Sequence, residues 1–220
     1  MWIFQNKMKE FETEILNPRL EHYISGLSSH DDPVLKDMET LAEKTEFPII
    51  GPLVGRILYQ ITLISGARKI LELGSGFGYS AIWFAKAVRA DGEIICTDKS
   101  HDNCNKAREY FSRASVQQKI RYEVGDSLEI LKNQTGKFDI ILNDIDKEEY
   151  PAVTELAEQK LVKGGILITD NVLWFGRVIS DDPSLSTAGV KKFNQDIFSN
   201  RKFITSILPV RDGIALSIRI

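Results

Sequence analysis

The first 66 residues carry apolar side chains at the spacing of an amphipathic helix. Three segments, residues 11–27, 31–47 and 51–66, place them three or four positions apart. The second segment opens with Asp-Asp-Pro, an order that favours the first turn of a helix, and the third ends at Gly66. These patterns predict three helices at the start of the chain.

From residue 69 the pattern changes to short, continuous apolar runs that alternate with helical segments. Such runs are typical of parallel strands buried on both faces of an α/β sheet. The last two runs are separated only by RDG, which predicts an antiparallel hairpin. We therefore expect a doubly wound α/β fold with a mixed sheet. The strand-like runs are KILELG, EIICTD, IRYEVGD, FDIILND, GILITD, KFITSILPV and GIALSIRI, and the helical segments include YSAIWFAKAVRA, HDNCNKAREYFSRA, SLEILKNQ and AVTELAEQKLV.

Composition is that of a soluble globular protein, with 43% hydrophobic and 27% charged residues in a chain of 220. We find no linker or repeat, and expect one domain over residues 1–220, with helices in 1–66 and an α/β core in 67–220. The formal net charge of -3 gives no general basic field, which disfavours nonspecific DNA binding.

The first 15 residues mix acids and bases and lack the apolar block of a secretory signal, and no apolar run approaches the ~20 residues of a membrane span. We therefore expect a cytoplasmic protein that does not enter membranes. Cys96 and Cys104 cannot form a disulfide framework, and we interpret both as structural thiols. The three histidines are not spaced as zinc ligands, so any metal site should use oxygen ligands.

Glycines follow the first strand-like run in the stretch ELGSGFGYS. Ligands of open α/β sheets bind at the carboxyl ends of strands, where glycine lets the backbone approach them closely. The GxGxG spacing differs from the GxGxxG of dehydrogenases, but the second run ends in Asp98, a carboxylate suited to ribose hydroxyls. The third run ends in Asp126 and Ser127, which could bind an adenine edge. Together these ends predict an adenosine pocket; alternatively, the glycines only form a tight turn and Asp98 caps the next helix.

Oxygen-bearing side chains also end the fourth and fifth runs. Asp144 follows one, and Asp170 with Asn171 follows the other. Neighbouring strand ends would bring these three together as ligands for Mg²⁺, Ca²⁺ or Mn²⁺. The Asp-Asn pair taken alone is also typical of a turn, so the metal prediction depends on the combination with Asp144.

Six stretches together resemble the cation-dependent, S-adenosylmethionine-dependent O-methyltransferases, the family of catechol and caffeoyl-CoA O-methyltransferases and their bacterial relatives. The resemblance covers about residues 30 to 220. It implies a Rossmann-like class I methyltransferase fold with a seven-stranded sheet, and a homodimer whose N-terminal helices shape the acceptor site. The stretches are LELGSGFGYSA, CTD, VGDS, NDIDKEEY, ITDNVLWFGRV and LPVRDGIALS.

The resemblance also implies a role for individual residues. The methyl donor would be bound by Ile50, Glu72, Gly74, Ser75, Ser80, Asp98, Asp126, Ser127, Asp144 and Asp146, with Ser80 at its carboxylate and Ile50 contributing a backbone contact. Asp144, Asp170 and Asn171 would hold the divalent cation, and Lys147 would be the catalytic base, with Asp144 beside it.

General chemistry supports these roles. A phenolic hydroxyl must lose its proton before it attacks a methyl group at neutral pH, and a divalent cation stabilises the oxyanion that results. Lys147, close to that cation and partly desolvated, would favour its neutral form and accept the proton. Lys147 can also be interpreted as an ordinary residue of a helix start. Two adjacent substrate oxygens could bind one cation, so we expect a vicinal dihydroxy acceptor.

The acceptor itself is not determined by the sequence. Tyr150, Trp174 and Phe175 either line its pocket or only pack. Phe175 replaces an asparagine of the plant caffeoyl-CoA type, which disfavours that substrate. A hydroxyuridine in transfer RNA is an alternative acceptor, because one bacterial branch of the family methylates it. A nicotinamide-dependent oxidoreductase is a remote alternative.

Overall fold

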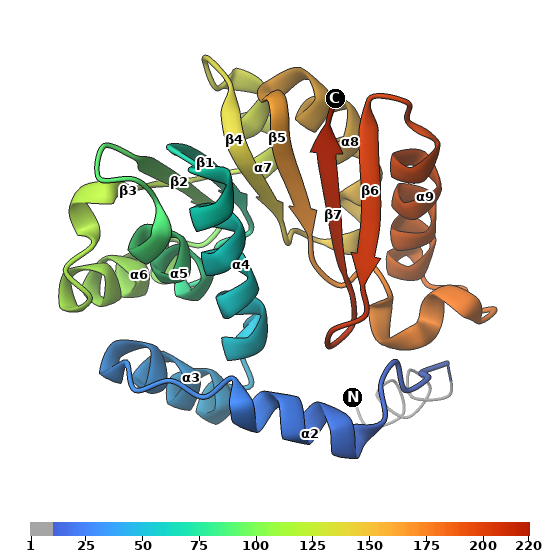
Figure 1. Ribbon diagram of the computed structural model, residues 1–220, viewed down its shortest axis with the longest axis horizontal. Coiled ribbons are helices and arrows are strands. Elements are labelled where there is room, and N and C mark those ends of the chain that lie inside the picture. Colours follow the sequence, from blue (N-terminus) through green and yellow to red (C-terminus); the bar gives the residue numbers. More distant parts are fainter. Residues whose placement is uncertain (1–10) are drawn as a thin grey trace.

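A single seven-stranded sheet forms the centre of the computed structural model, which describes residues 11–220 (Figure 1). The strand order is β3-β2-β1-β4-β5-β7-β6, in which β1 to β5 pair in parallel and β7 is antiparallel to both β5 and β6. This confirms the predicted seven-stranded mixed sheet. The strands are β1 Lys69–Leu73, β2 Glu93–Asp98, β3 Ile120–Val124, β4 Phe138–Asn143, β5 Leu161–Thr169, β6 Phe203–Leu208 and β7 Ile214–Arg219.

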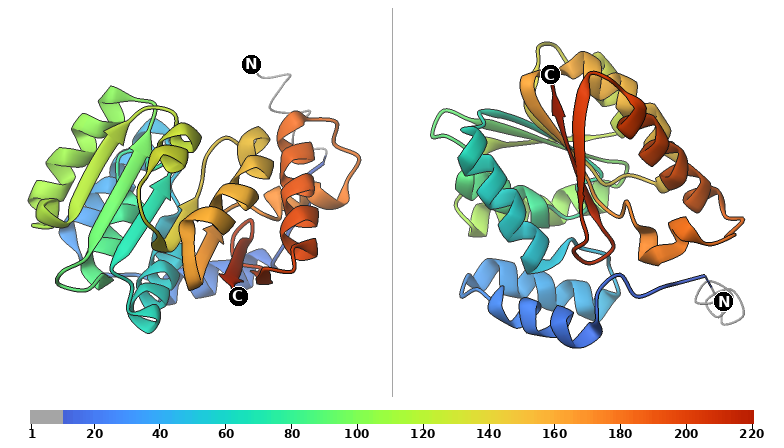
Figure 2. Two further views of the ribbon diagram at one scale, coloured as in Figure 1. Left: turned by 90° about the horizontal axis from the view of Figure 1, so that it is seen from above. Right: turned by 45° about the vertical axis from the view of Figure 1, so that its right-hand side comes forward.

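Helices cover both faces of the sheet, and the right-hand view of Figure 2 shows the two layers with the sheet between them. The longer helices are α2 Pro18–Leu27, α3 Pro33–Thr45, α4 Gly51–Ser65, α5 Tyr79–Ala87, α6 His101–Arg113, α7 Ser127–Asn133, α8 Tyr150–Lys160 and α9 Leu185–Ser199. Three short 3₁₀ segments are η1 Gln117–Lys119, η2 Lys147–Glu149 and η3 Trp174–Ile179.

Alternate residues of the strands face two separate apolar cores. Ile70 and Ile140 belong to the core formed with α3 to α6, and Leu71 and Ile141 to the core formed with α7 to α9. These four side chains are fully buried. Burial on both faces explains why the strands appear in the sequence as continuous apolar runs.

Capping residues fix the predicted helix ends. Oδ1 of Asp32 accepts hydrogen bonds from the backbone N–H groups of Val34 and Leu35, at 2.9 and 3.0 Å, immediately before α3. Gly66 adopts a left-handed conformation, with φ of 63°, at the end of α4. Both ends agree with the sequence prediction.

The helix predicted for residues 11–27 is shorter in the structure and begins at Pro18. Proline disfavours the helical conformation of the residue before it. Asn17 accordingly lies outside α2, and its side chain accepts a hydrogen bond from the Arg19 N–H at 3.0 Å. Residues 11–17 form no helix and lie beside η3 (Figure 1).

The later part of the chain shows two further differences. The predicted helix AVTELAEQKLV ends at Lys160, because Leu161 already pairs with Phe138 in the sheet. The sequence analysis also missed α9, although Phe193 and Ile197 lie one helical turn apart and are both fully buried.

Within residues 11–220, every helix is too short or too polar to cross a membrane. Residues 1–10, which carry most of the segment interpreted as lacking a secretory signal, lie outside the described residues.

Candidate active site

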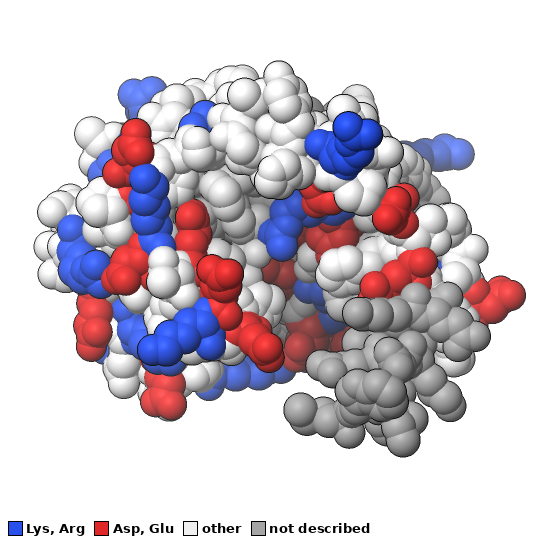
Figure 3. Space-filling view, turned by 90° about the horizontal axis from the view of Figure 1, so that it is seen from below, with Lys and Arg blue, Asp and Glu red and all other residues white. Residues whose placement is uncertain are grey.

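A cavity of about 560 Å³ opens at the carboxyl edge of the sheet. Seen from this edge, the surface is hollowed, and acidic and basic side chains both gather around the hollow (Figure 3). We call it the central cavity. Its lining includes the predicted residues Ile50, Gly74, Ser75, Ser80, Asp98, Ser127, Asp144, Asp146, Lys147, Asp170 and Asn171, whereas Glu72 and Asp126 are not part of it.

The glycine loop after β1 is held closely against its neighbours. Gly74 has a φ of +83°, and a Cβ atom there would lie 2.3 Å from the carbonyl oxygen of Asp144. The N–H groups of Gly74 and Ser75 donate to the carbonyl of Thr97, at 3.1 and 2.8 Å. Only glycine permits this approach between the loop and the end of β4, so the loop forms a fixed wall of the cavity.

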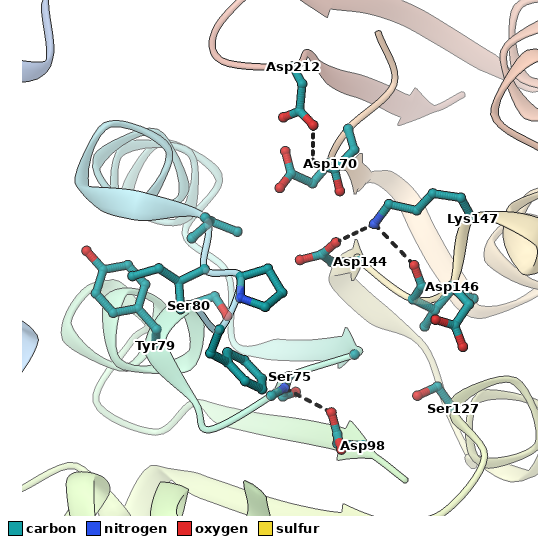
Figure 4. Close-up of a pocket in the computed structure, with 18 of the residues that line it drawn as sticks. Ser75, Tyr79, Ser80, Asp98, Ser127, Asp144, Asp146, Lys147, Asp170 and Asp212 are labelled. Atoms are coloured by element: carbon teal, nitrogen blue, oxygen red, sulfur yellow. Dashed lines mark hydrogen bonds and ion pairs between the residues drawn. The ribbon is translucent and has the colours of Figure 1, made fainter. Parts of the chain in front are cut away.

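Asp98 connects that loop to the start of α6. Its Oδ2 accepts the N–H of Gly76 at 3.1 Å (Figure 4). Its Oδ1 accepts the N–H of Ser100 at 2.7 Å and the side-chain amide of Asn103 at 3.2 Å. A carboxylate has about four acceptor positions. Asp98 therefore orders both segments and retains acceptor capacity towards the cavity.

Glu72 lies below the cavity surface, 1% exposed. Ser80, which lines the cavity, donates a hydrogen bond to Oε1 of Glu72, and the Cys96 thiol lies 3.6 Å from Oε2. Burial raises the pKa of Glu72 to about 7, against the hydrogen bonds from these neighbours. The structure therefore positions Glu72 to orient Ser80, and its direct contact with a cofactor stays a prediction.

Asp126 and Ser127, at the end of β3, have different roles in the structure. Asp126 caps α7, because its Oδ1 accepts the N–H groups of Leu128 and Glu129, both at 3.0 Å. These backbone hydrogen bonds, that of Glu129 first, and the nearby Lys99 lower the pKa of Asp126. Ser127 instead lines the cavity and accepts a hydrogen bond from Thr97 at 2.8 Å. Of the predicted adenine-binding pair, Ser127 has the suitable position.

Three aspartates from three different strand ends meet at the opposite side of the cavity. Asp144 follows β4, Asp170 follows β5, and Asp212 precedes β7; Asp170 and Asp212 are both 4% exposed. Burial, followed by the charges of Asp144 and Asp212, raises the pKa of Asp170 to about 8. Burial also raises the pKa of Asp144, against the effect of Lys147. Burial and mutual repulsion thus oppose ionisation of these carboxylates, and a bound cation would favour their charged forms.

Lys147 is the main cation of this corner (Figure 4). Its Nζ donates to Oδ1 of Asp144 at 2.9 Å and to the carbonyl of Ile145 at 3.2 Å. The same atom lies 5.1 Å from the ring centroid of Tyr150 and 5.7 Å from that of Trp174. Four contacts therefore hold the amine at one point of the cavity wall.

The candidate aromatic residues separate into two groups. Trp174 and Phe175 line the central cavity, whereas Tyr150 is fully buried and its hydroxyl donates to the carbonyl of Asp170 at 2.9 Å. Tyr150 therefore supports the strand end, while the other two rings are positioned to contact an acceptor.

Asp212 and Arg211 were missed as site residues. They lie in the turn between β6 and β7, where Asp212 accepts a hydrogen bond from the side-chain amide of Asn171 at 2.7 Å and Arg211 donates to the carbonyl of Ile49 at 2.8 Å. The predicted antiparallel hairpin could have identified them. The turn of such a hairpin lies at the same sheet edge as the carboxyl ends of the parallel strands.

A divalent cation fits the donor chemistry of this corner. Among residues 11–220, no three His, Cys, Asp or Glu side chains already form a metal site. The predicted set has only two carboxylates, Asp144 and Asp170, with the Asn171 amide as a neutral oxygen donor. Hard cations prefer such oxygens and accept water or substrate at their remaining positions. The mutual repulsion of these buried carboxylates, noted above, favours such an ion.

Comparison with known proteins identifies the family. Residues 25–220 match the sequence model of a family described as O-methyltransferase. The chain belongs to this family. It therefore transfers a methyl group to a hydroxyl oxygen, and the nicotinamide-dependent alternative is wrong.

The relatives of the chain are similar over most of their length. A catechol O-methyltransferase from Niastella koreensis is 29% identical over 211 residues, which cover 90% of this chain and 96% of the relative. A flavonoid 3',5'-methyltransferase from Vitis vinifera is 30% identical and covers 76% of each chain. The solved O-methyltransferase from Bacillus cereus in complex with SAH is 26% identical, with a TM-score of 0.84 and coverage of 92% of this chain and 97% of that one.

Proposed function

We propose that the protein transfers the methyl group of S-adenosylmethionine to one hydroxyl of a small vicinal dihydroxy, catechol-like molecule, with a bound Mg²⁺ or similar divalent cation. The observation that carries the proposal is that one cavity joins the glycine loop to the corner of Asp144, Lys147 and Asp170. The catechol O-methyltransferase relative and the SAH-bound neighbour support the acceptor and the donor.

The methyl donor would occupy the side of the cavity formed by β1, β2 and β3. Asp98 would accept hydrogen bonds from ribose hydroxyls with its remaining acceptor capacity, and Ser127 would contact the adenine. Ser80, oriented by Glu72, would bind the carboxylate of the methionine part. These contacts would direct the methyl group towards the acidic corner.

Divalent cation binding would fall to Asp144, Asp170 and Asn171. When bound, the cation would stabilise the oxyanion of the acceptor. Asp212 would orient Asn171, because it accepts a hydrogen bond from Nδ2 of Asn171. The amide oxygen of Asn171 then stays available as a ligand for the cation. The carboxylate of Asp146 is more exposed than that of Asp144, and its Oδ2 lies 3.9 Å from Nζ of Lys99. Asp146 would contribute to the part of the cavity that binds S-adenosylmethionine.

The chemical step then needs few groups. The bound S-adenosylmethionine would supply the methyl group, whose bond to sulfur would break with its electron pair left on sulfur as the acceptor oxygen bonds to the carbon. Lys147 would release one of its protons to solvent and then accept the hydroxyl proton, so the amine ends each cycle as it began. Because the sulfonium already activates the methyl group, the protein contributes mainly position and a water-poor site.

The experiment that tests this proposal measures methyl transfer to a panel of catechols and to bulk tRNA, each with Mg²⁺ and with EDTA. We expect methylated catechol only in the presence of the cation. Methylation of tRNA but of no catechol would favour the hydroxyuridine alternative. Undiminished activity after thorough chelation would contradict the proposed metal role.

A further inference from the structure

Trp174 lies on the wall of the central cavity, in the loop that follows β5. Its φ angle is 48°, and those of Phe175 and Gly176 are 54° and 75°, a conformation that bulky side chains rarely adopt. The N–H of Trp174 donates to the carbonyl of Asp212 at 3.1 Å. A Cβ atom on Gly176 would lie only 2.6 Å from the carbonyl oxygen of Thr13, so these two backbones are in contact. The backbone of the loop is therefore held on both sides.

The ring of Trp174 is oriented by charge and not by a hydrogen bond. Its Nε1 atom is buried, and no acceptor among residues 11–220 lies within hydrogen-bond distance of it. Two cations lie over the ring instead, with Nζ of Lys147 at 5.7 Å and the guanidinium carbon of Arg177 at 5.6 Å from the ring centroid. Such contacts are strongest where water is excluded. The side chain of Arg177 is 4% exposed, against 13% for that of Lys147, so Arg177 makes the better shielded contact.

Arg177 is held in turn by a carboxylate that precedes helix α9. Its Nη2 atom lies 2.8 Å from Oδ2 of Asp182, and both side chains are buried. The same oxygen accepts hydrogen bonds from the hydroxyls of Ser184, at 2.8 Å, and of Thr187, and Ser184 caps α9. A charged pair with several hydrogen bonds has a defined geometry. The guanidinium is therefore fixed to the first turn of α9.

Helix α9 also contacts the backbone of Lys147. A Cβ atom on Gly189 would lie 2.2 Å from the carbonyl oxygen of Lys147, so the helix and this segment touch. The hydroxyl of Ser186 donates to Oε1 of Glu148 at 2.5 Å. Both cations that lie over the indole are therefore positioned by one helix, and α9 relates the place of the ring to that of the amine.

We propose that Arg177 is a positioning residue for methyl transfer. Anchored to α9 by Asp182, it holds the Trp174 ring beside the Lys147 amine, and the ring orients the acceptor so that one particular hydroxyl faces that amine. This inference rests on the proposed function. Arg177 does not line the central cavity, so its effect on the reaction passes through Trp174.

The test uses 4-methylcatechol, whose two hydroxyls give two different methyl ethers, at saturating S-adenosylmethionine and Mg²⁺. We expect wild type to favour one ether. Arg177→Met should bring the product ratio towards one and raise the KM for the acceptor about three- to tenfold, with cofactor affinity unchanged within about twofold. Arg177→Lys keeps the charge but loses the planar guanidinium, and should give an intermediate ratio.

A double-mutant cycle shows whether Arg177 acts through Trp174. In a Trp174→Ala background, Arg177→Met should change neither the product ratio nor KM, whereas independent effects would add. Ile197→Ala, at a fully buried position of α9, is the control for lost stability and should leave the ratio unchanged. If Arg177→Met alone fails to fold, its combination with Asp182→Asn replaces the buried ion pair by two neutral side chains and takes its place.

Fluorescence gives a readout that needs no acceptor. The signal of Trp174 is the difference between each protein and the same protein carrying Trp174→Phe. Acrylamide should quench this signal more strongly in Arg177→Met than in wild type, because the ring is then held less firmly. Ile197→Ala should show wild-type quenching.

The outcomes separate the two proposals. A wild-type product ratio near one, an unchanged ratio or unchanged quenching in Arg177→Met, or additive effects in the cycle would overturn the inference and leave the catechol function intact. A wild-type protein that methylates no catechol would instead refute the proposed function, and the inference with it.

Discussion

Lys147 is the residue whose surroundings most directly suggest a chemical role. Its amine contacts Asp144 and lies near the rings of Tyr150 and Trp174, on a wall that also contains the proposed cation ligands. Asp98 lies on the donor side and bonds to no group of that corner. The two residues therefore allow separate tests of chemistry and of cofactor binding.

Lys147→Ala should lower kcat by about 100-fold or more, the usual contribution of a general base, and change the affinity for S-adenosylmethionine by less than about twofold. Asp98→Ala should mainly weaken cofactor binding. Steady-state kinetics and calorimetry measure the two effects. If both variants changed kcat and affinity equally, the division of roles would be refuted.

Glu72 gives a prediction on the pH dependence of stability. Its pKa is about 7 in the folded protein against an ordinary value of 4.5. As pH rises from 4.5 to 7, the unfolded chain loses this proton first, so the free energy of unfolding falls by about 3 kcal/mol and stays lower above pH 7. Glu72→Gln removes this titration. The free energy of unfolding of the variant, relative to that of wild type, should therefore be higher at pH 8 than at pH 4.5. Urea unfolding at both pH values measures this; an identical pH profile would contradict it.

At the scale of elements, the loop after β5 joins catalysis to the N-terminal segment. Trp174, Phe175 and Gly176 all have positive φ angles, between 48° and 75°. Arg177, buried in an ion pair with Asp182 at 2.8 Å, lies over the ring of Trp174. The N–H of Thr13 donates to the carbonyl of Phe175 at 2.8 Å. The buried ion pair and this backbone contact hold the strained segment in place.

Gly176→Ala should separate this loop from Thr13. We expect a loss of about 1 to 3 kcal/mol of unfolding free energy and a higher KM for the acceptor, with unchanged cofactor affinity. Gly164→Ala is the matched control, because Gly164 has a similar φ of +79° and no atom within 4 Å of an added Cβ. An equal loss of stability in both variants would show that backbone strain alone, and not the Thr13 contact, is responsible.

At the scale of the whole molecule, negative charge is concentrated where three strand ends meet. Asp144, Asp170 and Asp212 repel one another in the absence of a cation, and this repulsion is part of the cause of the raised pKa of Asp170. This repulsion lowers the stability of the folded protein, and a bound cation would restore that stability.

Mg²⁺ should therefore raise the melting temperature of the wild-type protein. At pH 9, where the Asp170 carboxyl is ionised, Asp170→Asn should melt higher than wild type in EDTA, because it removes a buried charge. The variant should also lose most of the Mg²⁺ response together with activity. Differential scanning fluorimetry measures both effects. A Mg²⁺ response of equal size in the variant would exclude Asp170 as a ligand.

Helix α2 carries an exposed apolar stripe. It has no buried residue, and Leu20, Tyr23 and Leu27 are exposed at 53%, 63% and 64% along it. We expect a homodimer that covers this stripe, with a mass of about 50 kDa by light scattering, twice 24.9 kDa. Leu20→Glu combined with Leu27→Glu should give a monomer, whereas Leu185→Glu, at another exposed apolar position, should not. A monomeric wild-type protein would contradict the prediction.

The sequence by itself determined the order of strands and helices and most of the candidate site. Continuous apolar runs such as those around Ile70 and Ile140 reflect burial on both faces, a constraint local enough to be visible along the chain. For the same reason, Asp98, Asp144 and Asp170 could be found, because each directly follows such a run. Helix α9 was equally visible in its spacing but was overlooked.

Only the tertiary structure decided which polar residues face the cavity and which hold the fold. Asp126 and Ser127 are adjacent, yet one caps a helix and the other lines the cavity. Asp212 joins Asp170 only because β7 inserts between β5 and β6. The hydrogen bond between Thr13 and Phe175 likewise joins two residues that are far apart in sequence. Contacts between distant segments depend on how the elements pack, and a local pattern of residues carries no record of that packing.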